Sequence, residues 1–227
     1  MKKSLLFASL LATSLTANAA FFEGSTSGVF VNPQGPAGMV TSGVGTNSFS
    51  WGDPATTHCW GCTSPSSLTF HGLNFAANVD DTFALGVMKF YNGTIWAGTE
   101  ATSVDFSLTF NFTSPNNFVE SFTYDFALDN TPNIGDPNDD ADSVKLTSLG
   151  PQQFYSYQGT DYYFELLGFN GQEEMVAKEL KWAKVKLVGQ FTSVPSEIPL
   201  PAAVWLFGSG LMGFMAFRRR AKMQAAV

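Results

Sequence analysis

The chain has 227 residues and a formal net charge of −7. All 19 acidic residues but only six of the 12 basic residues lie between positions 20 and 197, so this central part carries a net charge near −13. Such a charge argues against nucleic acid and anionic membrane surfaces as partners, and it suits solubility or the binding of divalent cations. The central part is long enough for one domain with a substantial core.

The first 19 residues have the three parts of a secretory signal peptide. Lys2 and Lys3 give a positive start, an apolar stretch covers 4–15, and Ala17-Asn18-Ala19 supplies small residues where signal peptidase requires them. The apolar stretch is shorter than the ~20 residues that span a bilayer, which argues against an uncleaved anchor. We therefore expect a signal helix in 1–19 that signal peptidase removes after Ala19.

The central part has the alternating pattern of short strands joined by turns. In 103–112 every second residue is apolar, and 118–128 repeats the pattern after a turn at 114–117, which predicts two half-buried antiparallel strands. Further strands are expected at 28–31, 47–51, 67–71, 82–91, 143–149, 153–158, 161–169 and 180–192. We predict an all-β domain over 20–192, folded as a two-sheet antiparallel β-sandwich of the jelly-roll type, with a barrel as the alternative.

Two cysteines stand close together in a segment that reads as a loop. Cys59-Trp60-Gly61-Cys62 in an exported chain is typical of a small-loop disulfide between Cys59 and Cys62. A zinc site made by these cysteines with His58 and His71 is an alternative, and it requires reduced thiols and four converging ligands. A redox pair of the thioredoxin type needs a βαβ context that this segment lacks.

An acidic loop follows the second of the two alternating strands. Asp136, Asn138, Asp140 and Asp142 stand at every second position, and oxygen ligands of this kind suit Ca²⁺. Ala141 stands where an EF-hand loop has its glycine and Thr147 where it has a bidentate Glu, so an EF-hand is excluded. A non-EF-hand Ca²⁺ loop and a solvated acidic turn both fit the pattern. No other cofactor is expected.

The last part of the domain mixes apolar and charged residues less regularly. We expect a short helical turn in 171–179. The lysines that alternate with apolar residues in 180–192 favour an edge strand, because charged side chains discourage edge-to-edge pairing. Residues 193–197 read as a linker to the tail.

The C-terminal tail has the pattern of a single membrane-spanning helix. No charge occurs from Ile198 to Phe217, a length that just spans a hydrocarbon core of ~30 Å. The basic cluster after it acts as a stop-transfer signal and stays cytoplasmic by the positive-inside rule. This cluster consists of Arg218, Arg219, Arg220 and Lys222. The central domain is then expected outside the inner membrane.

The tail resembles the PEP-CTERM sorting domain in its VPLPA variant. The motif Ile198-Pro199-Leu200-Pro201-Ala202, the following Trp-Leu-Phe-Gly-Ser-Gly run and the terminal arginines carry the likeness, which covers 198–222. The resemblance implies that an exosortase recognises the tail, cuts near the motif and passes the protein to the cell surface or the extracellular matrix. The prolines keep the motif extended and accessible, because they cannot take part in helical hydrogen bonding.

Short motifs across 26–192 resemble the domain called choice-of-anchor K. They include Gly43-Val44-Gly45-Thr46, Phe49-Ser50-Trp51-Gly52, Asn92-Gly93-Thr94-Ile95 and Leu166-Leu167-Gly168-Phe169. The resemblance implies an extracytoplasmic domain with an alternative C-terminal anchor, and it implies no activity.

The functional expectation is an exported, exosortase-processed surface or matrix protein that is not an enzyme and that associates with exopolysaccharide or biofilm. The usual catalytic motifs are absent from the sequence, and two histidines leave little material for a triad. The first alternative is a carbohydrate-binding module that uses Trp60 or Trp96, since aromatic rings with polar rims hold sugars. The second alternative is a secreted glycosidase, whose two carboxylates need only be close in space.

Overall fold

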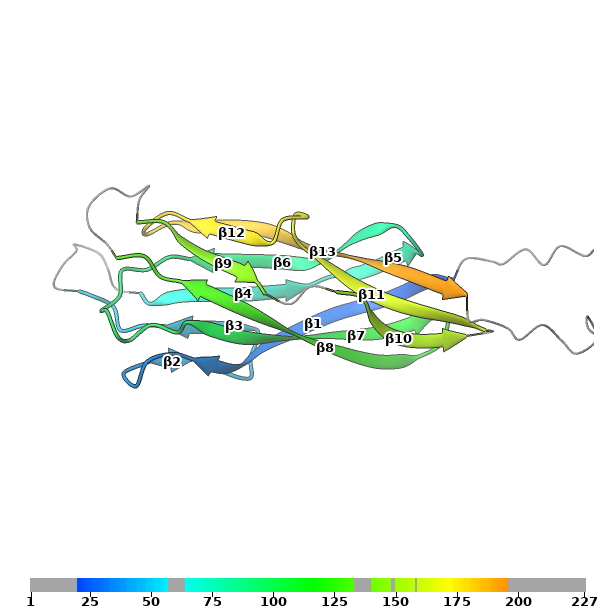
Figure 1. The fold of residues 1–227 in the computed structure, drawn as a ribbon, viewed down its shortest axis with the longest axis horizontal. Coiled ribbons are helices and arrows are strands. Elements are labelled where there is room, and N and C mark those ends of the chain that lie inside the picture. Colours follow the sequence, from blue (N-terminus) through cyan, green and yellow to red (C-terminus); the bar gives the residue numbers. More distant parts are fainter. Residues whose placement is uncertain (1–19, 57–63, 133–139, 148–149, 158, 196–227) are drawn as a thin grey trace, which may run out of the picture.

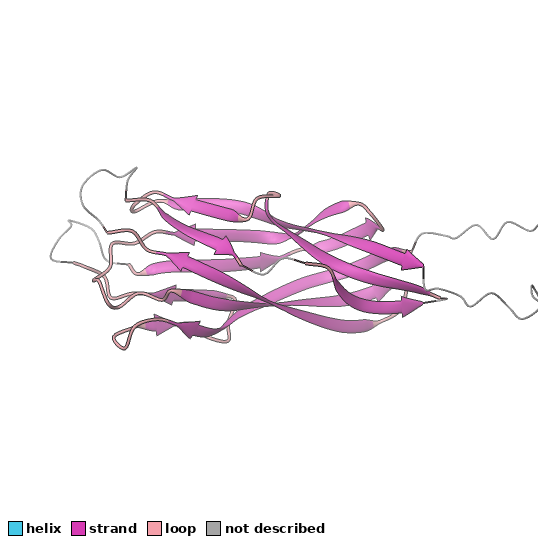
Figure 2. Cartoon of the chain, viewed as in Figure 1, coloured by secondary structure: helices cyan, strands magenta, loops and turns pink. Residues whose placement is uncertain are grey.

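The computed structural model describes residues 20–56, 64–132, 140–147, 150–157 and 159–195. These residues form strands, turns and loops without a helix, arranged as two antiparallel sheets stacked face to face (Figures 1 and 2). The two-sheet antiparallel sandwich is therefore confirmed. The signal peptide, the sorting motif and the tail helix lie outside the described residues.

Each sheet runs without interruption across the molecule. The six-stranded sheet, called sheet A here, has the order β12 (Glu174–Ala177), β9 (Asp142–Leu146), β8 (Phe118–Asp129), β7 (Ser103–Ser114), β1 (Phe21–Gln34) and β5 (Asn74–Asn78). The seven-stranded sheet, called sheet B, has the order β10 (Gln152–Tyr157), β11 (Thr160–Phe169), β13 (Trp182–Pro195), β6 (Thr82–Tyr91), β4 (Ser66–Gly72), β3 (Ser48–Trp51) and β2 (Thr41–Ser42).

The alternation in the sequence becomes the two faces of sheet A. Val104, Phe106, Leu108 and Phe110 of β7 are fully buried, and their polar neighbours along the strand point outward. β8 pairs with β7 in regular antiparallel register, with Phe106 opposite Tyr124. The predictions for both strands and for the turn between them are thus confirmed.

The core between the sheets is built mainly from phenylalanine rings. Phe191 of sheet B lies at its centre, with ring centroids 4.9 Å from Phe22, 5.9 Å from Phe110 and 4.7 Å from Phe83. Burial of each such ring contributes about 1.5–3 kcal/mol, and edge-to-face contacts add a little more. The abundance of Phe in the sequence is therefore an adaptation to one aromatic core.

Three predictions about the last part of the domain are wrong. A strand, β12, occupies 174–177 instead of a helical turn, because Met175 and Ala177 alternate as buried residues and β12 pairs with β9. β13 lies between β11 and β6 rather than at an edge, since an outward lysine face does not prevent hydrogen bonding on both sides of a strand. β13 also extends to Pro195, into the segment expected as a linker.

The chain enters and leaves the sandwich at the same end. β1 begins and β13 ends at the right of Figure 1, and the connections after β6, β8 and β12 lie at the opposite end, which we call the loop end. Buried polar residues of these connections form a candidate site.

Candidate functional site

Asn92 joins three segments at the loop end. It follows β6, it is fully buried, and its Nδ2 atom donates hydrogen bonds to the carbonyl oxygens of Ala177 (3.1 Å) and Asp140 (3.3 Å). Its backbone nitrogen donates to Lys181 O (3.1 Å), and its carbonyl oxygen accepts from Leu180 N (2.9 Å). In the sequence, Asn92 stands out only as part of a family motif. Its structural role depends on contacts more than 40 residues away in the sequence, which spacing cannot reveal.

Asp142 is a buried carboxylate at the start of β9. Its Oδ1 atom accepts hydrogen bonds from the backbone nitrogen of Thr131 (2.8 Å) and from the Thr131 hydroxyl (2.9 Å). Burial raises the pKa of Asp142 to about 6; the two bonds from Thr131 act against this rise, and the negative charges of Glu179 and Asp129 add to it. The loop end therefore holds a carboxyl group that titrates close to neutral pH.

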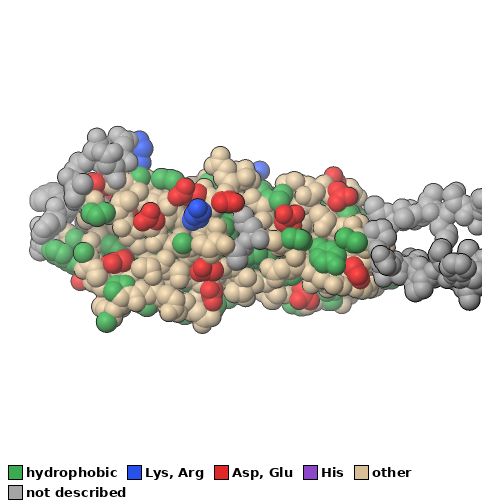
Figure 3. Space-filling view, viewed as in Figure 1, with side chains coloured by type: hydrophobic (Ala, Val, Ile, Leu, Met, Phe, Trp, Pro, Cys, Tyr) green, Lys and Arg blue, Asp and Glu red, His purple; other side chains and the backbone are tan. Residues whose placement is uncertain are grey.

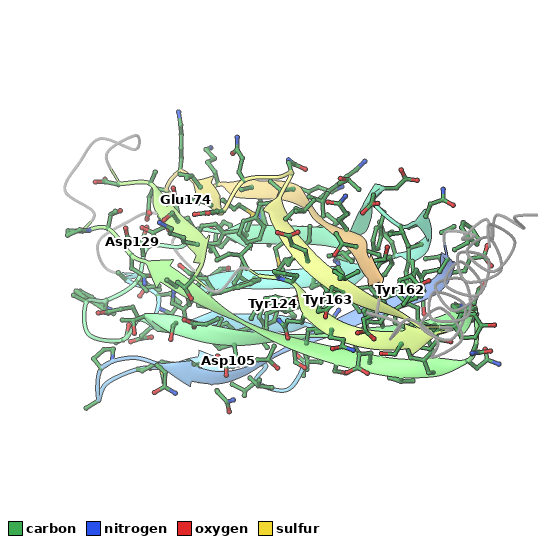
Figure 4. The ribbon with its side chains drawn as sticks, turned by 45° about the vertical axis from the view of Figure 1, so that its right-hand side comes forward. Asp105, Tyr124, Asp129, Tyr162, Tyr163 and Glu174 are labelled. Atoms are coloured by element: carbon green, nitrogen blue, oxygen red, sulfur yellow. The ribbon has the colours of Figure 1, made fainter. Side chains whose placement is uncertain are left out.

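Glu179 is a second acidic group in the same region. Burial raises its pKa, the hydrogen bond that its Oε1 atom accepts from the Thr94 hydroxyl lowers it, and the charge of Asp140 raises it. Figure 4 shows Asp129 and Glu174 at this end of the sandwich, with Tyr162 toward the other end. The acidic residues of β8, β9 and the β12–β13 turn thus share one electrostatic environment.

The predicted calcium loop lies only partly in the described residues. Asp140 and Asp142 are both buried, whereas Asp136 and Asn138 fall outside the description. In the described ranges, no three side chains of the His, Cys, Asp and Glu types gather as a metal site. Calcium binding stays a prediction, and a comparison of the melting temperature in millimolar Ca²⁺ and in chelator tests it.

The residues proposed for a disulfide or a zinc site are mostly outside the description as well. His58, Cys59 and Cys62 lie in the undescribed 57–63 segment, and His71 is exposed on β4. Both alternatives for the cysteine pair therefore stay predictions.

The tryptophans considered for sugar binding have different environments. Trp51 is a core residue, 1% exposed, and its Nε1 atom donates a hydrogen bond to Asn130 Oδ1 (2.8 Å), so it offers no ring face to a ligand. Trp96 is 39% exposed, and Trp60 lies outside the described residues. The most exposed tryptophan among the described residues is Trp182 at the start of β13, at 61% exposure, which the sequence pattern alone did not indicate as a sugar-binding residue.

Trp182 lies beside Tyr91 on the outer face of sheet B. The two residues are opposite each other in the pairing of β13 with β6, and their ring centroids are 5.0 Å apart. The next outward pair along the same strands is Lys184 and Lys89, and a shallow hollow of about 330 Å³ is lined by Trp182, Ala183, Lys184 and Lys89. We call Tyr91, Trp182, Lys89 and Lys184 the lysine–tryptophan patch. The sequence contains a signal for this patch, because Trp182 begins an alternating stretch in which the next two residues on its face are Lys184 and Lys186.

Comparison with known families finds a match in the C-terminal tail. The PEP-CTERM protein-sorting motif matches residues 197–220, which overlaps the predicted tail of 198–222 except for its last two residues. The motif implies an exported protein that is targeted to exosortase, held in the membrane and then passed to the surface. A search of curated proteins found no match to the sequence. Among the described residues, which do not include the tail, no helix is long and apolar enough to cross a membrane.

Proposed function

We propose that this chain is a structural protein of the cell surface or extracellular matrix, without enzymatic activity, that associates with exopolysaccharide after exosortase has processed it. The observation that carries the proposal is the PEP-CTERM motif at 197–220, placed directly after a single β-sandwich. The likeness of the tail to the VPLPA variant and of the domain to choice-of-anchor K supports the same role.

The charge distribution supports a sandwich that is exposed to water and stays in solution. Figure 3 shows acidic side chains scattered over the visible face, with few lysines among them. A strongly acidic surface keeps a protein soluble and opposes nonspecific binding to anionic lipid. The sandwich then extends from the membrane while the tail is intact and is released when the tail is cut.

The proposed topology has residues 20–197 outside the inner membrane and Arg218–Lys222 inside, as the charges that flank the tail imply. Alkaline phosphatase fused after Glu197 is expected to be active in intact cells, because this enzyme folds only outside the cytoplasm. An inactive fusion that is nevertheless stable and abundant would reverse the orientation.

Matrix association is tested with the mature protein purified from the surface of the cells that export it. The protein is expected to sediment with native extracellular polysaccharide from the same cells and to remain in solution with an unrelated neutral polymer. Recovery of the protein only in the soluble fraction with both polymers would contradict the proposal.

A carbohydrate-binding module is the second candidate. The specific observation in its favour is the exposed Trp182–Tyr91 pair beside a hollow on sheet B. A glycosidase is not supported by any comparable observation in the described residues.

A further inference from the structure

The outer face of sheet B carries ordered rows of side chains that run across its strands. One row contains Trp182, Tyr91 and Ser67, and the next contains Lys184, Lys89 and Thr69. Thr69 continues to β3 through a 3.0 Å hydrogen bond between its hydroxyl and that of Ser48. Four neighbouring strands span roughly 14 Å, so aromatic, cationic and hydroxyl groups cover a flat surface of that width.

The two lysines of the patch are unfavourably placed in the absence of a ligand. Lys89 and Lys184 are directly opposite in register, an arrangement in which like charges repel. Neither lysine forms an ion pair with any described carboxylate. Asp105 and Asp125 are also opposite on sheet A, but Asp105 accepts a hydrogen bond from Asn32 and Asp125 accepts one from Thr147.

The exposed ring of Trp182 is the second unusual feature. Tryptophan is highly buried on average, and β13 places its neighbours Ala183 and Val185 against the core while Trp182 stays 61% exposed. Its contact with Tyr91 holds the ring beside the lysines. An apolar ring face next to two lysines without an ion pair among the described residues fits a ligand with an apolar face and negative charges of its own.

We propose that the lysine–tryptophan patch binds an acidic polysaccharide, in which the C–H face of a sugar ring stacks on Trp182 and Tyr91 and sugar carboxylates pair with Lys89 and Lys184. The patch thus deepens the proposed function by naming the binding face and the class of polymer. Ser67, Thr69 and Ser48 supply hydroxyls for the ligand's own hydroxyl groups.

The surroundings of the patch favour a glycan over the other polyanions. Nucleic-acid affinity comes largely from lysines and arginines that neutralise phosphates, whereas this domain has only six basic residues and a net charge near −13. A protein partner of ordinary size needs a buried apolar centre, and the rows beside the patch are hydroxyl-rich. The repulsion between an acidic domain and an acidic polymer is limited by screening, which acts over about 8 Å at physiological salt.

The test measures binding of the mature protein to alginate oligosaccharides, which carry one carboxylate per sugar, with dextran as a neutral probe. Wild type is expected to bind alginate and not dextran. Trp182→Ala and the double variant Lys89→Gln/Lys184→Gln are each expected to weaken binding by roughly 10-fold or more. The double variant also reduces the salt dependence of what remains, because fewer charges take part.

The matched control uses an exposed lysine on the other sheet. Lys145→Gln, on β9 of sheet A, should bind alginate as wild type does. Circular dichroism melting of every variant shows that the fold is retained, which is expected because Trp182 and Lys184 are exposed.

Four outcomes would overturn the inference. The first three are equal binding by wild type and the patch variants, equal binding of alginate and dextran, and preferential binding of a DNA duplex at the same salt. The fourth is loss of self-association in Trp182→Ala, which would assign the patch to contacts between copies.

The matrix sedimentation assay tests the proposed function separately from the patch. If the patch variants lose alginate but still sediment with native matrix, the patch inference stands and matrix association uses another surface. If wild type binds alginate but fails to sediment, the proposed function fails alone.

Discussion

At the scale of single residues, Tyr124 places a polar hydroxyl group in the aromatic core. Its ring is fully buried in β8, and its hydroxyl has no hydrogen-bond partner among the described residues. Burial without a partner raises the pKa of this phenol well above its usual range, because the charged form is even less favourable there.

Removing this hydroxyl is expected to stabilise the protein. Tyr124→Phe keeps the ring and its packing and deletes a buried polar atom without a partner, so the free energy of unfolding should rise by about 1 kcal/mol. Urea denaturation at neutral pH measures the change. A loss of 2 kcal/mol or more would show that the hydroxyl has a partner essential to the core.

The raised pKa of Asp142 makes the free energy of unfolding depend on pH. Its folded pKa of about 6 lies above the ordinary value of 3.8, so between these values the folded protein holds a proton that the unfolded chain has released. The stabilisation is complete below about pH 4 and is lost as the pH rises through 6, by at most about 3 kcal/mol.

The substitution Asp142→Asn removes the ionisable group and keeps an oxygen that can accept the hydrogen bonds. The amide oxygen can still accept from Thr131, so the variant should unfold with a flatter pH profile between 4 and 7 and should be more stable at pH 7. Urea denaturation across this range measures both effects. Asp53→Asn on an exposed loop is the control, and an unchanged slope in Asp142→Asn would assign the pH dependence to other groups.

At the scale of strands, two glycines make room for the core rings of Phe106 and Phe70. A Cβ atom on Gly28 of β1 would lie 2.4 Å from the ring of Phe106 and 3.0 Å from that of Phe70. A Cβ atom on Gly86 of β6 would lie 2.4 Å from the Phe70 ring and 2.5 Å from a backbone oxygen. The two sheets thus approach each other around Phe70 because these positions lack side chains.

Gly28→Ala is therefore expected to destabilise the sandwich by about 1–3 kcal/mol, the usual cost of overpacking a filled core. Chemical denaturation measures the loss. Gly150→Ala serves as the control, since no atom lies within 4 Å of the added methyl group. Equal stability of both variants would mean that the rings around Gly28 relax without cost.

The strands also show what the sequence could predict. β7 and β8 were predictable because strict alternation continues for ten residues or more and one face becomes the core. β12 was not, because four residues with an exposed Val176 give too short a pattern. The central place of β13 was not predictable either, since side-chain alternation defines the faces of a strand and carries no information about its neighbours.

The candidate sites also differ in how far the sequence could predict them. The sorting motif is continuous in sequence, so it could be recognised directly, and the family match covers residues 197–220. The contacts among Asn92, Asp140 and Ala177, and the pairing of Trp182 with Tyr91, join residues that are far apart in the chain. Only strand order and register bring them together.

At the scale of the whole molecule, we expect the sorting motif to govern release from the membrane. Pro199→Ala with Pro201→Ala allows the segment to continue the tail helix, so exosortase should lose its extended substrate. We expect the variant to stay in the membrane fraction with an intact tail, detected as peptides from 206–227 by mass spectrometry of the isolated protein.

Pro36→Ala, in the β1–β2 connection, is the matched control and should be released as wild type is. Release of the double variant without its tail would show that the prolines are dispensable for cutting. Wild-type protein on the surface with the tail intact would contradict processing altogether.

The position of β13 has a consequence for the timing of folding during export. It is the last strand in the chain, yet it separates β10 and β11 from the other four strands of sheet B. Until residues 182–195 have crossed the membrane, sheet B exists only as two unconnected pieces and Phe191 is missing from the core. We therefore expect the domain to reach its final shape only after its last strand has been exported, when the sorting tail itself arrives at the membrane.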